Sequence, residues 1–173
     1  MVDNLEDLGG LADRWTQSFF DHAFVAARLS KDPAGGVGAV IVGPGARIVS
    51  SGFNGLPSGI NHNHILTSDR LTKLACTIHA EENALAFAWQ DVMGMELYST
   101  RQPCARCAAM IVQRNISCVH YIVGQGSINP DWAHSFKLAD EMFNLAGVRS
   151  LQYVRQINEC DEFVYYEWLK PIL

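Results

Sequence analysis

The feature that most constrains the fold of this chain is a histidine and two cysteines at the expected starts of two helices. His79-Ala80-Glu81 opens one stretch of helical pattern, and Pro103-Cys104-Ala105-Arg106-Cys107 opens another. One imidazole and two thiolates provide three protein ligands for zinc and leave a fourth position for water, as in catalytic zinc sites. The positive ends of the two helix dipoles stabilise the thiolates. The fold is therefore expected to bring two helix N-termini together around a single zinc ion.

Glu81 lies two residues after His79, where a carboxylate can move protons beside the metal without binding it. Zinc acidifies a bound water, and Glu81 is then suited to act first as general base and later as general acid. This predicts hydrolytic release of ammonia from an amidine carbon of an aromatic base. The combination of H-x-E with P-C-x-x-C resembles the signature of the zinc-dependent nucleobase deaminases.

A structural zinc site is the alternative for the same residues. A C-x-x-C pair alone also occurs in zinc knuckles and redox motifs, and Cys76, three residues before His79, is the candidate fourth ligand. Its apolar neighbours favour a buried thiol instead. The other two cysteines, Cys118 and Cys160, are expected to be core thiols rather than disulfide partners.

Composition limits the class of protein. The chain has 173 residues, of which 49% are hydrophobic, so we expect one α/β domain over residues 1–173. A net charge of −5 with scattered basic residues argues against a nucleic-acid partner and leaves an anionic mononucleotide as a candidate ligand. No apolar run matches a membrane helix, and residues 1–7 lack the layout of a signal peptide, which predicts a cytoplasmic protein without membrane contact.

Periodicity predicts alternating helices and strands, and hence a central sheet with helices on both sides. The stretch 54–77 is long and irregular, and such stretches are usually functional or partly helical, so it is a candidate substrate loop. The expected helices are residues 13–30, 79–90, 104–114 and 135–145, and the expected strands are 37–42, 47–53, 95–100, 119–123 and 148–154.

Further motifs spread over most of the chain resemble those of the deoxycytidylate (dCMP) deaminases, within the cytidine deaminase fold. They are Ser30-Lys31-Asp32-Pro33 before an apolar run, Gly52-Phe53-Asn54-Gly55-Leu56-Pro57-Ser58-Gly59, His79-Ala80-Glu81-Glu82-Asn83-Ala84-Leu85, and Met142-Phe143-Asn144-Leu145-Ala146-Gly147-Val148. The resemblance implies a three-layer α/β/α sandwich with a central five-stranded mixed sheet. It also implies conversion of dCMP to dUMP and ammonia, which supplies dUMP for thymidylate synthesis.

The resemblance assigns roles to individual residues. His79, Cys104 and Cys107 would hold zinc, and Glu81 would be the catalytic proton shuttle. Asn54 would hydrogen-bond the deoxyribose, with a left-handed turn residue before a glycine as the alternative.

Other implied roles concern the nucleotide and its effectors. The backbone at Ala80 would contact the base, and Lys31 or Arg28 would meet the 5′-phosphate, unless these two are solvated surface cations. Members of the family are often hexamers that dCTP activates and dTTP inhibits. The glycine-rich loop with Gly52, Phe53 and Gly55 contributes to the regulatory site there.

Some residues fall outside this pattern. His62 and His64 suggest a second metal, although solvent-exposed or substrate-facing imidazoles are the favoured interpretation. Tyr121, Trp132 and His134 are candidate pocket residues on position, and core packing explains Tyr121 equally well.

Two other functions stay open at this stage. One is a deaminase of 5-substituted dCMP, of dCTP or of a base in nucleic acid. The other is a non-catalytic, zinc-stabilised nucleotide-binding module, against which the presence of Glu81 argues.

Overall fold

The computed structural model describes residues 8–60, 69–124, 130–158 and 162–168. The described strands are β1 (Leu8–Leu11), β2 (Gly38–Gly43), β3 (Arg47–Phe53), β4 (Glu96–Ser99), β5 (Cys118–Ile122), β6 (Arg149–Ile157) and β7 (Phe163–Trp168). The described helices are α1 (Arg14–Ala27), α2 (Arg70–Cys76), α3 (Ala80–Ala86), α4 (Ala105–Gln113) and α5 (Pro130–Ala146). In this part of the chain, no helix has the length and apolar character needed to cross a lipid bilayer.

All of these strands form one mixed sheet in the order β1-β7-β6-β5-β4-β2-β3. β4, β5 and β6 run parallel to one another, whereas the β2–β3, β2–β4, β6–β7 and β1–β7 pairs are antiparallel. Because parallel neighbours need crossover connections, the helices between them pack back onto the sheet.

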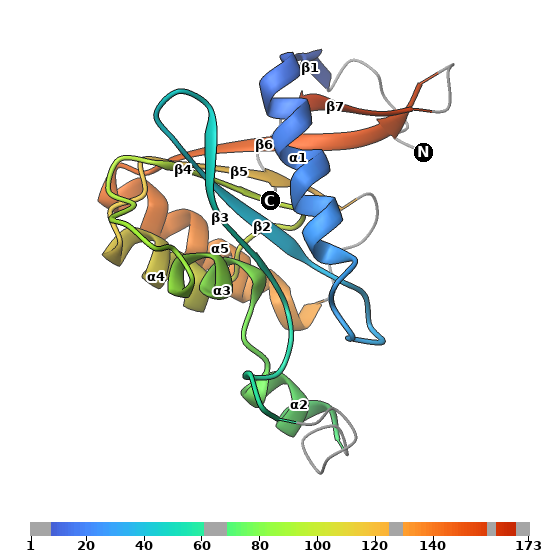
Figure 1. Cartoon of the computed structure of the whole chain (residues 1–173), viewed down its shortest axis with the longest axis vertical. Coiled ribbons are helices and arrows are strands. Elements are labelled where there is room, and N and C mark those ends of the chain that lie inside the picture. The colour runs from blue at the N-terminus through green and yellow to red at the C-terminus, as the bar shows by residue number, and fades with distance from the viewer. Residues whose placement is uncertain (1–7, 61–68, 125–129, 159–161, 169–173) are drawn as a thin grey trace.

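Side chains along β2 show why helices cover both faces. Ala39 and Ile41 enter the core beneath α3, α4 and α5, whereas Val40 and Val42 enter a second core beneath α1. Figure 1 shows α1 on one side of the sheet and α3, α4 and α5 on the opposite side. The predicted α/β architecture is therefore confirmed.

The predicted number of strands is wrong, because the sheet formed by the described residues has seven strands instead of five. β1 and β7 were missed: β1 is short with two glycines, and it pairs only with β7 at the far end of the chain. Local pattern gives little indication of such an edge strand. The aromatic and β-branched run in β7, Phe163-Val164-Tyr165-Tyr166, does favour a strand by its composition.

The predicted helices form with shorter or longer bounds. α1 begins after Asp13, whose carboxylate accepts hydrogen bonds from the backbone of Trp15 and Thr16, and it ends at Ala27. α3 ends at Ala86, four residues before the expected end at Gln90. The long stretch 54–77 is partly helical, as one interpretation expected, because its last part forms α2. Figure 1 shows α2 standing apart from the two helical layers.

Candidate active site

His79 and Cys104 occupy equivalent positions, since each is the residue that caps the N-terminus of a helix, α3 for His79 and α4 for Cys104. α3 lies close against β3: a Cβ atom at Gly52 would come within 2.3 Å of the Ala80 carbonyl oxygen. The Ser50 hydroxyl also donates to the Ala84 carbonyl at 2.7 Å. Glycine at position 52 thus lets the start of α3 settle on the sheet edge.

An arginine connects the two helix starts. Arg106 on α4 donates from Nη2 to the Thr77 carbonyl at 2.8 Å and to Glu82 Oε2 at 2.6 Å. The same Glu82 oxygen accepts from the His79 backbone N–H at 2.8 Å. These bonds hold the backbone of His79 beside the first turn of α4.

The structure brings the three predicted metal ligands together. His79 Nδ1 lies 3.4 Å from Cys104 Sγ and 3.3 Å from Cys107 Sγ. All three donor atoms lie within 4.8 Å of one another. Ligand atoms around tetrahedral zinc are separated by roughly 3.5–3.8 Å, so the two nitrogen–sulfur distances lie within a few tenths of an ångström of the spacing that zinc requires. One nitrogen and two sulfur donors fit zinc, and the group can hold one metal ion.

The pKa values of the two thiols in this group are shifted in opposite directions. A hydrogen bond from Cys107 lowers the pKa of the Cys104 thiol to about 4, which makes Cys104 a thiolate at neutral pH. Sharing that proton, together with burial, raises the pKa of Cys107. Zinc binds cysteine as thiolate, so metal uptake is expected to release the Cys107 proton.

Glu81 is 3% exposed and lies beside the metal ligands. Ser99 Oγ donates to Glu81 Oε1 at 2.9 Å, and Cys107 Sγ lies 3.4 Å from Glu81 Oε2. Burial raises the pKa of Glu81, which moves it towards the range where a carboxyl group can both take and give a proton near neutral pH. Ser99 was not among the predicted residues, because a serine in a strand carries no pattern of its own.

A cavity of about 650 Å³ opens onto this group. We call the part lined by His79, Ala80, Glu81 and Cys104 its inner end, because the last three of these residues are buried. Aromatic rings of α5 form one wall there, with Trp132 6.1 Å from the His79 ring and stacked on Phe136. We call its polar part the outer end, because Asp69, Arg70 and Arg101 there are exposed; the polar lining also includes Asp32, Asn54 and Lys73. A cavity of this size holds a small organic ligand.

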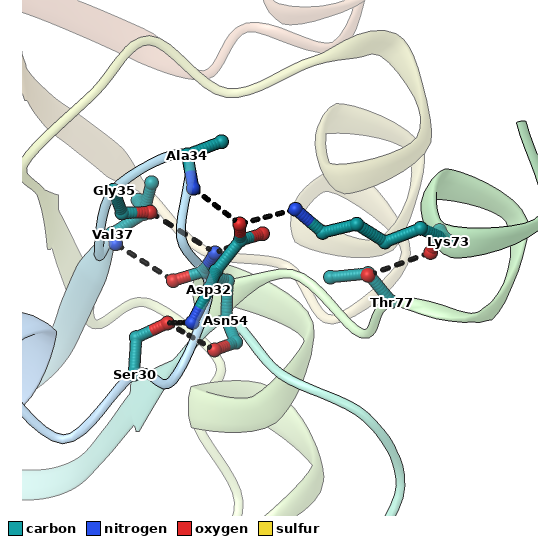
Figure 2. Close-up of polar contacts among 8 residues, drawn as sticks. All are labelled: Ser30, Asp32, Ala34, Gly35, Val37, Asn54, Lys73 and Thr77. Carbon is teal, nitrogen blue, oxygen red and sulfur yellow. Dashed lines mark hydrogen bonds and ion pairs between the residues drawn. The ribbon is translucent and has the colours of Figure 1, made fainter. Parts of the chain in front are cut away.

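Asn54 lines this cavity, but its side chain also holds the cavity wall together (Figure 2). Its Oδ1 accepts from the Val37 backbone N–H at 2.7 Å, and its Nδ2 donates to Asp32 Oδ2 at 3.3 Å and to the Gly35 carbonyl at 3.4 Å. Asn54 is not among the residues with positive φ, which excludes the left-handed turn interpretation. The residue fastens the 30–37 segment to the end of β3.

A second set of contacts that holds the 30–37 segment in place comes from α2. Lys73 reaches from α2 to Asp32 Oδ1, which also accepts from the Ala34 backbone N–H at 2.8 Å (Figure 2). Thr77 Oγ1 donates to the Lys73 carbonyl at 2.7 Å and closes the end of this helix. Although α2 stands apart from the layers, it thereby becomes a wall of the cavity.

The two cations predicted to meet a phosphate lie elsewhere. Arg28 is exposed at the C-terminal cap of α1, and Lys31 is exposed and lines a different cavity. Among the described residues that line the metal-site cavity, the cations are Arg70, Lys73 and Arg101. Sequence pattern did not single them out, since their approach depends on how α2 and the β4–α4 connection fold.

A second cavity of about 510 Å³ is lined in part by the C-terminal end of β3. The glycine-rich loop lines it with Gly52, Phe53 and Gly55, and Lys31 and Phe87 contribute from other segments. Asn83 of α3 also lines this cavity and donates from Nδ2 to the Phe53 carbonyl at 2.7 Å.

The other candidate residues are placed as follows. Trp132 lines the metal-site cavity, whereas His134 is exposed and Tyr121 is fully buried in the sheet. His62 and His64 lie outside the described residues, as does the 125–129 part of the loop before α5. Cys76 is half-buried at the end of α2 and does not belong to the described metal group.

Comparisons with known proteins agree with this geometry. Residues 13–123 match the family model described as the cytidine and deoxycytidylate deaminase zinc-binding region. The human deoxycytidylate deaminase is 34% identical, over 81% of this chain and 80% of that protein. A deaminase of Aliivibrio fischeri described as uncharacterized, encoded in the luxG 3′ region, is 39% identical over 80% of this chain and 92% of that protein.

Solved structures give the same result. The dCMP deaminase of the cyanophage S-TIM5 in its apo form has a TM-score of 0.61 and 26% identity, covering 78% of this chain and 94% of that chain. The same phage enzyme has also been solved in complex with dCMP and dUMP. With the zinc-binding region matched over its helix starts and the metal group assembled in the structure, this chain belongs to the family of cytidine and deoxycytidylate deaminases.

Proposed function

We propose that this protein is a single-domain, zinc-dependent enzyme that hydrolyses dCMP to dUMP and ammonia. The observation that carries the proposal is the buried Glu81 carboxylate beside the His79, Cys104 and Cys107 donor atoms, at the inner end of a cavity of nucleotide size. Relatives named as deoxycytidylate deaminases support the choice of substrate.

His79, Cys104 and Cys107 would hold the zinc ion, which, when bound, supplies Lewis-acid activation of water near neutral pH. Glu81 takes a proton from the attacking water and delivers protons to the ring nitrogen and to the departing amine. Ser99 holds one Glu81 oxygen, so the other oxygen is directed towards the reacting atoms. The C4–N bond breaks, the water oxygen becomes the new carbonyl oxygen, and ammonia leaves.

The cavity supports a nucleotide rather than a nucleoside as the substrate. The base would enter between Ala80 and Trp132, and the 5′-phosphate would lie at the outer end among Arg70, Lys73 and Arg101. Arg101 is exposed, and no ion pair or side-chain hydrogen bond joins its guanidinium to another residue in the described ranges. Asn54 would serve the sugar mainly by fixing the 30–37 wall beside it.

The second cavity is a proposed site for a nucleotide effector. Its lining by Gly52, Phe53, Gly55 and Lys31 agrees with the regulation by dCTP and dTTP that the family resemblance implies. Assembly into a homo-oligomer, such as a hexamer, remains a prediction of that resemblance, and a cytoplasmic location remains a prediction from the apolar pattern of the sequence. Because the net charge of the chain is negative, we favour a mononucleotide over nucleic acid as the substrate.

The test is ammonia release by the zinc-loaded protein offered deoxycytidine, dCMP, 5-methyl-dCMP and dCTP separately, with and without dCTP or dTTP as effector. We expect a strong preference for dCMP. In the Glu81→Gln variant, turnover should fall by about 10²–10⁴-fold while bound zinc is unchanged, because only the proton transfer is lost.

Preference for another nucleotide of this set would keep the chemistry and reassign the specificity. If the wild-type protein releases ammonia from none of the four, the proposal of a mononucleotide substrate is wrong, and a nucleic-acid substrate or a non-catalytic module takes its place. Loss of zinc in Glu81→Gln would contradict the role of Glu81 as a group that acts beside the metal without being needed to hold it.

A further inference from the structure

A buried polar network joins α5 to the segment that leads into the metal ligands. Gln102, two residues before Cys104, is 9% exposed and lines the metal-site cavity. Its Nε2 lies 3.2 Å and 3.3 Å from the two carboxylate oxygens of Asp140 and 3.4 Å from the Tyr121 hydroxyl. The function proposed above makes no use of this network.

The network determines which way the Gln102 amide points. A carboxylate only accepts hydrogen bonds, so the side of the amide facing Asp140 must be its NH₂ group. Tyr121 reinforces this arrangement, because its hydroxyl accepts from Gln152 Nε2 at 2.9 Å and lies 3.3 Å from Asp140 Oδ1, to which it donates. The amide oxygen, Oε1, must then lie on the side away from Asp140.

Gln102 Oε1 is an accessible acceptor. Within the described ranges, no donor lies within hydrogen-bond distance of this oxygen. It is also not one of the fully buried side-chain atoms without a hydrogen-bond partner there, so part of its surface is exposed. Because Gln102 lines the cavity, this oxygen is available to a ligand beside the metal group. The Ser135 hydroxyl of α5 also accepts from the Ala105 backbone N–H at 3.0 Å, which holds α5 against the same segment.

We propose that Gln102 is a specificity-determining residue whose amide oxygen, oriented by Asp140, accepts a hydrogen bond from the exocyclic amine of the cytosine ring. This inference rests on the proposed deaminase function. The amine is a donor, whereas the carbonyl oxygen that replaces it in the product is an acceptor. An acceptor fixed in the cavity therefore favours the substrate and weakens binding of the uracil product, which helps product to leave.

The test compares affinities for dCMP and dUMP by calorimetry in a zinc-loaded Glu81→Gln background, where dCMP is expected to bind with little turnover. Gln102→Met keeps the length of the side chain and removes the acceptor. We expect the ratio of the dUMP to the dCMP dissociation constant to fall by about 2- to 10-fold. Gln152→Met is the matched control, because Gln152 does not line the cavity and its loss leaves both Asp140 oxygens facing the Gln102 NH₂ group, so the ratio should be unchanged.

Asp140→Asn provides a second, independent variant if Gln102→Met does not fold. An asparagine offers its own NH₂ group, so the Gln102 amide is no longer held in one orientation and the ratio should fall by a smaller factor. The inference is wrong if the ratio is unchanged in a folded, zinc-loaded Gln102→Met protein. If Gln102→Met does not fold, an unchanged ratio in Asp140→Asn contradicts the inference instead. Failure of the proposed function looks different, since the wild-type protein would then release no ammonia from dCMP.

Discussion

Each face of the sheet carries a histidine beside a glutamate, yet the surroundings of the two pairs differ. On the face covered by α3 and α4, His79 lies near Glu81 with two cysteines. On the face covered by α1, His120 Nε2 lies 3.0 Å from Glu96 Oε2. Adjacent residues of β4 serve the two pairs, because Ser99 bonds Glu81 and Tyr98 bonds Glu96.

The His120 pair is completed by protein groups. The Nδ1 atom of His120 lies 3.1 Å from the Tyr153 hydroxyl, and its ring stacks on Tyr98 with centroids 4.0 Å apart and planes 8° apart. Arg149 lies 3.7 Å from the second Glu96 oxygen. Both ring nitrogens and both carboxylate oxygens thus have partners, so this pair stabilises the fold.

The His79 pair differs because its donor atoms converge at a cavity. Its histidine nitrogen and two sulfurs face one another, and among the described side chains the partners of the Glu81 carboxylate are the Ser99 hydroxyl and the Cys107 thiol. The same residue types therefore give chemistry on one face and stability on the other. What decides between them is whether protein groups or a cavity lie next to the polar atoms. The comparison predicts that substitutions on the two faces have separable effects.

The largest effect is expected from Cys107→Ser, which removes a fully buried metal ligand. Zinc content and turnover should both be lost, because a hydroxyl is a much poorer zinc ligand than a thiolate. Metal analysis of the purified protein is the measurement. Cys76→Ser is the matched control and should retain zinc; loss of zinc in that variant would revive the structural, four-ligand interpretation.

Next comes Arg101→Ala, at the outer end of the same cavity. Removing a charge-assisted contact to the phosphate should raise the KM for dCMP by about 10-fold or more. The KM for deoxycytidine, which has no phosphate, should hardly change. Lys31→Ala tests the earlier assignment, and a larger effect on the dCMP KM from Lys31 than from Arg101 would reverse the placement of the phosphate.

Asn54→Ala should act on both stability and binding. It leaves the Val37 backbone N–H without its acceptor and frees the 30–37 wall, at a cost of about 1–3 kcal/mol in the free energy of unfolding. Urea unfolding measures that cost, and the KM for dCMP should rise in parallel. The exposed Ser58, changed to Ala, is the control; an effect there of the same size would show that the assay does not report on this wall.

The smallest effect is expected from Glu96→Gln on the opposite face. The hydrogen bond from His120 holds the pKa of Glu96 below its ordinary value of 4.5. The stabilisation is therefore complete above about pH 4.5 and is lost as the pH falls through the lower folded-state value. Because Glu96 is partly exposed, the variant should lose less than about 1 kcal/mol at neutral pH.

Thermal unfolding of the wild-type protein and of Glu96→Gln, measured from about pH 7 to about pH 3, checks this prediction. The difference in stability between the two proteins should become smaller as the pH falls. Turnover at neutral pH should be unchanged. A large loss of turnover in Glu96→Gln would break the distinction between the two faces.

The candidate site shows how far pattern alone reaches. His79, Glu81, Cys104 and Cys107 were predictable because each lies at or near a helix start, where spacing of a few residues sets the geometry. Ser99 and Gln102 were not, because their contacts to Glu81 and Asp140 join residues 18 and 38 positions apart.

By itself, the sequence determined the α/β class, five strands of the sheet and four of the helices, which depend on local periodicity, and the zinc-binding group, which depends on residue spacing at helix starts. Only the tertiary structure decided that β1 and β7 extend the sheet, that Asn54 fastens a wall, and that Arg101 rather than Lys31 lines the metal-site cavity. The physical reason is that cavity walls and edge strands form where distant segments meet, and no local pattern records which segments those are.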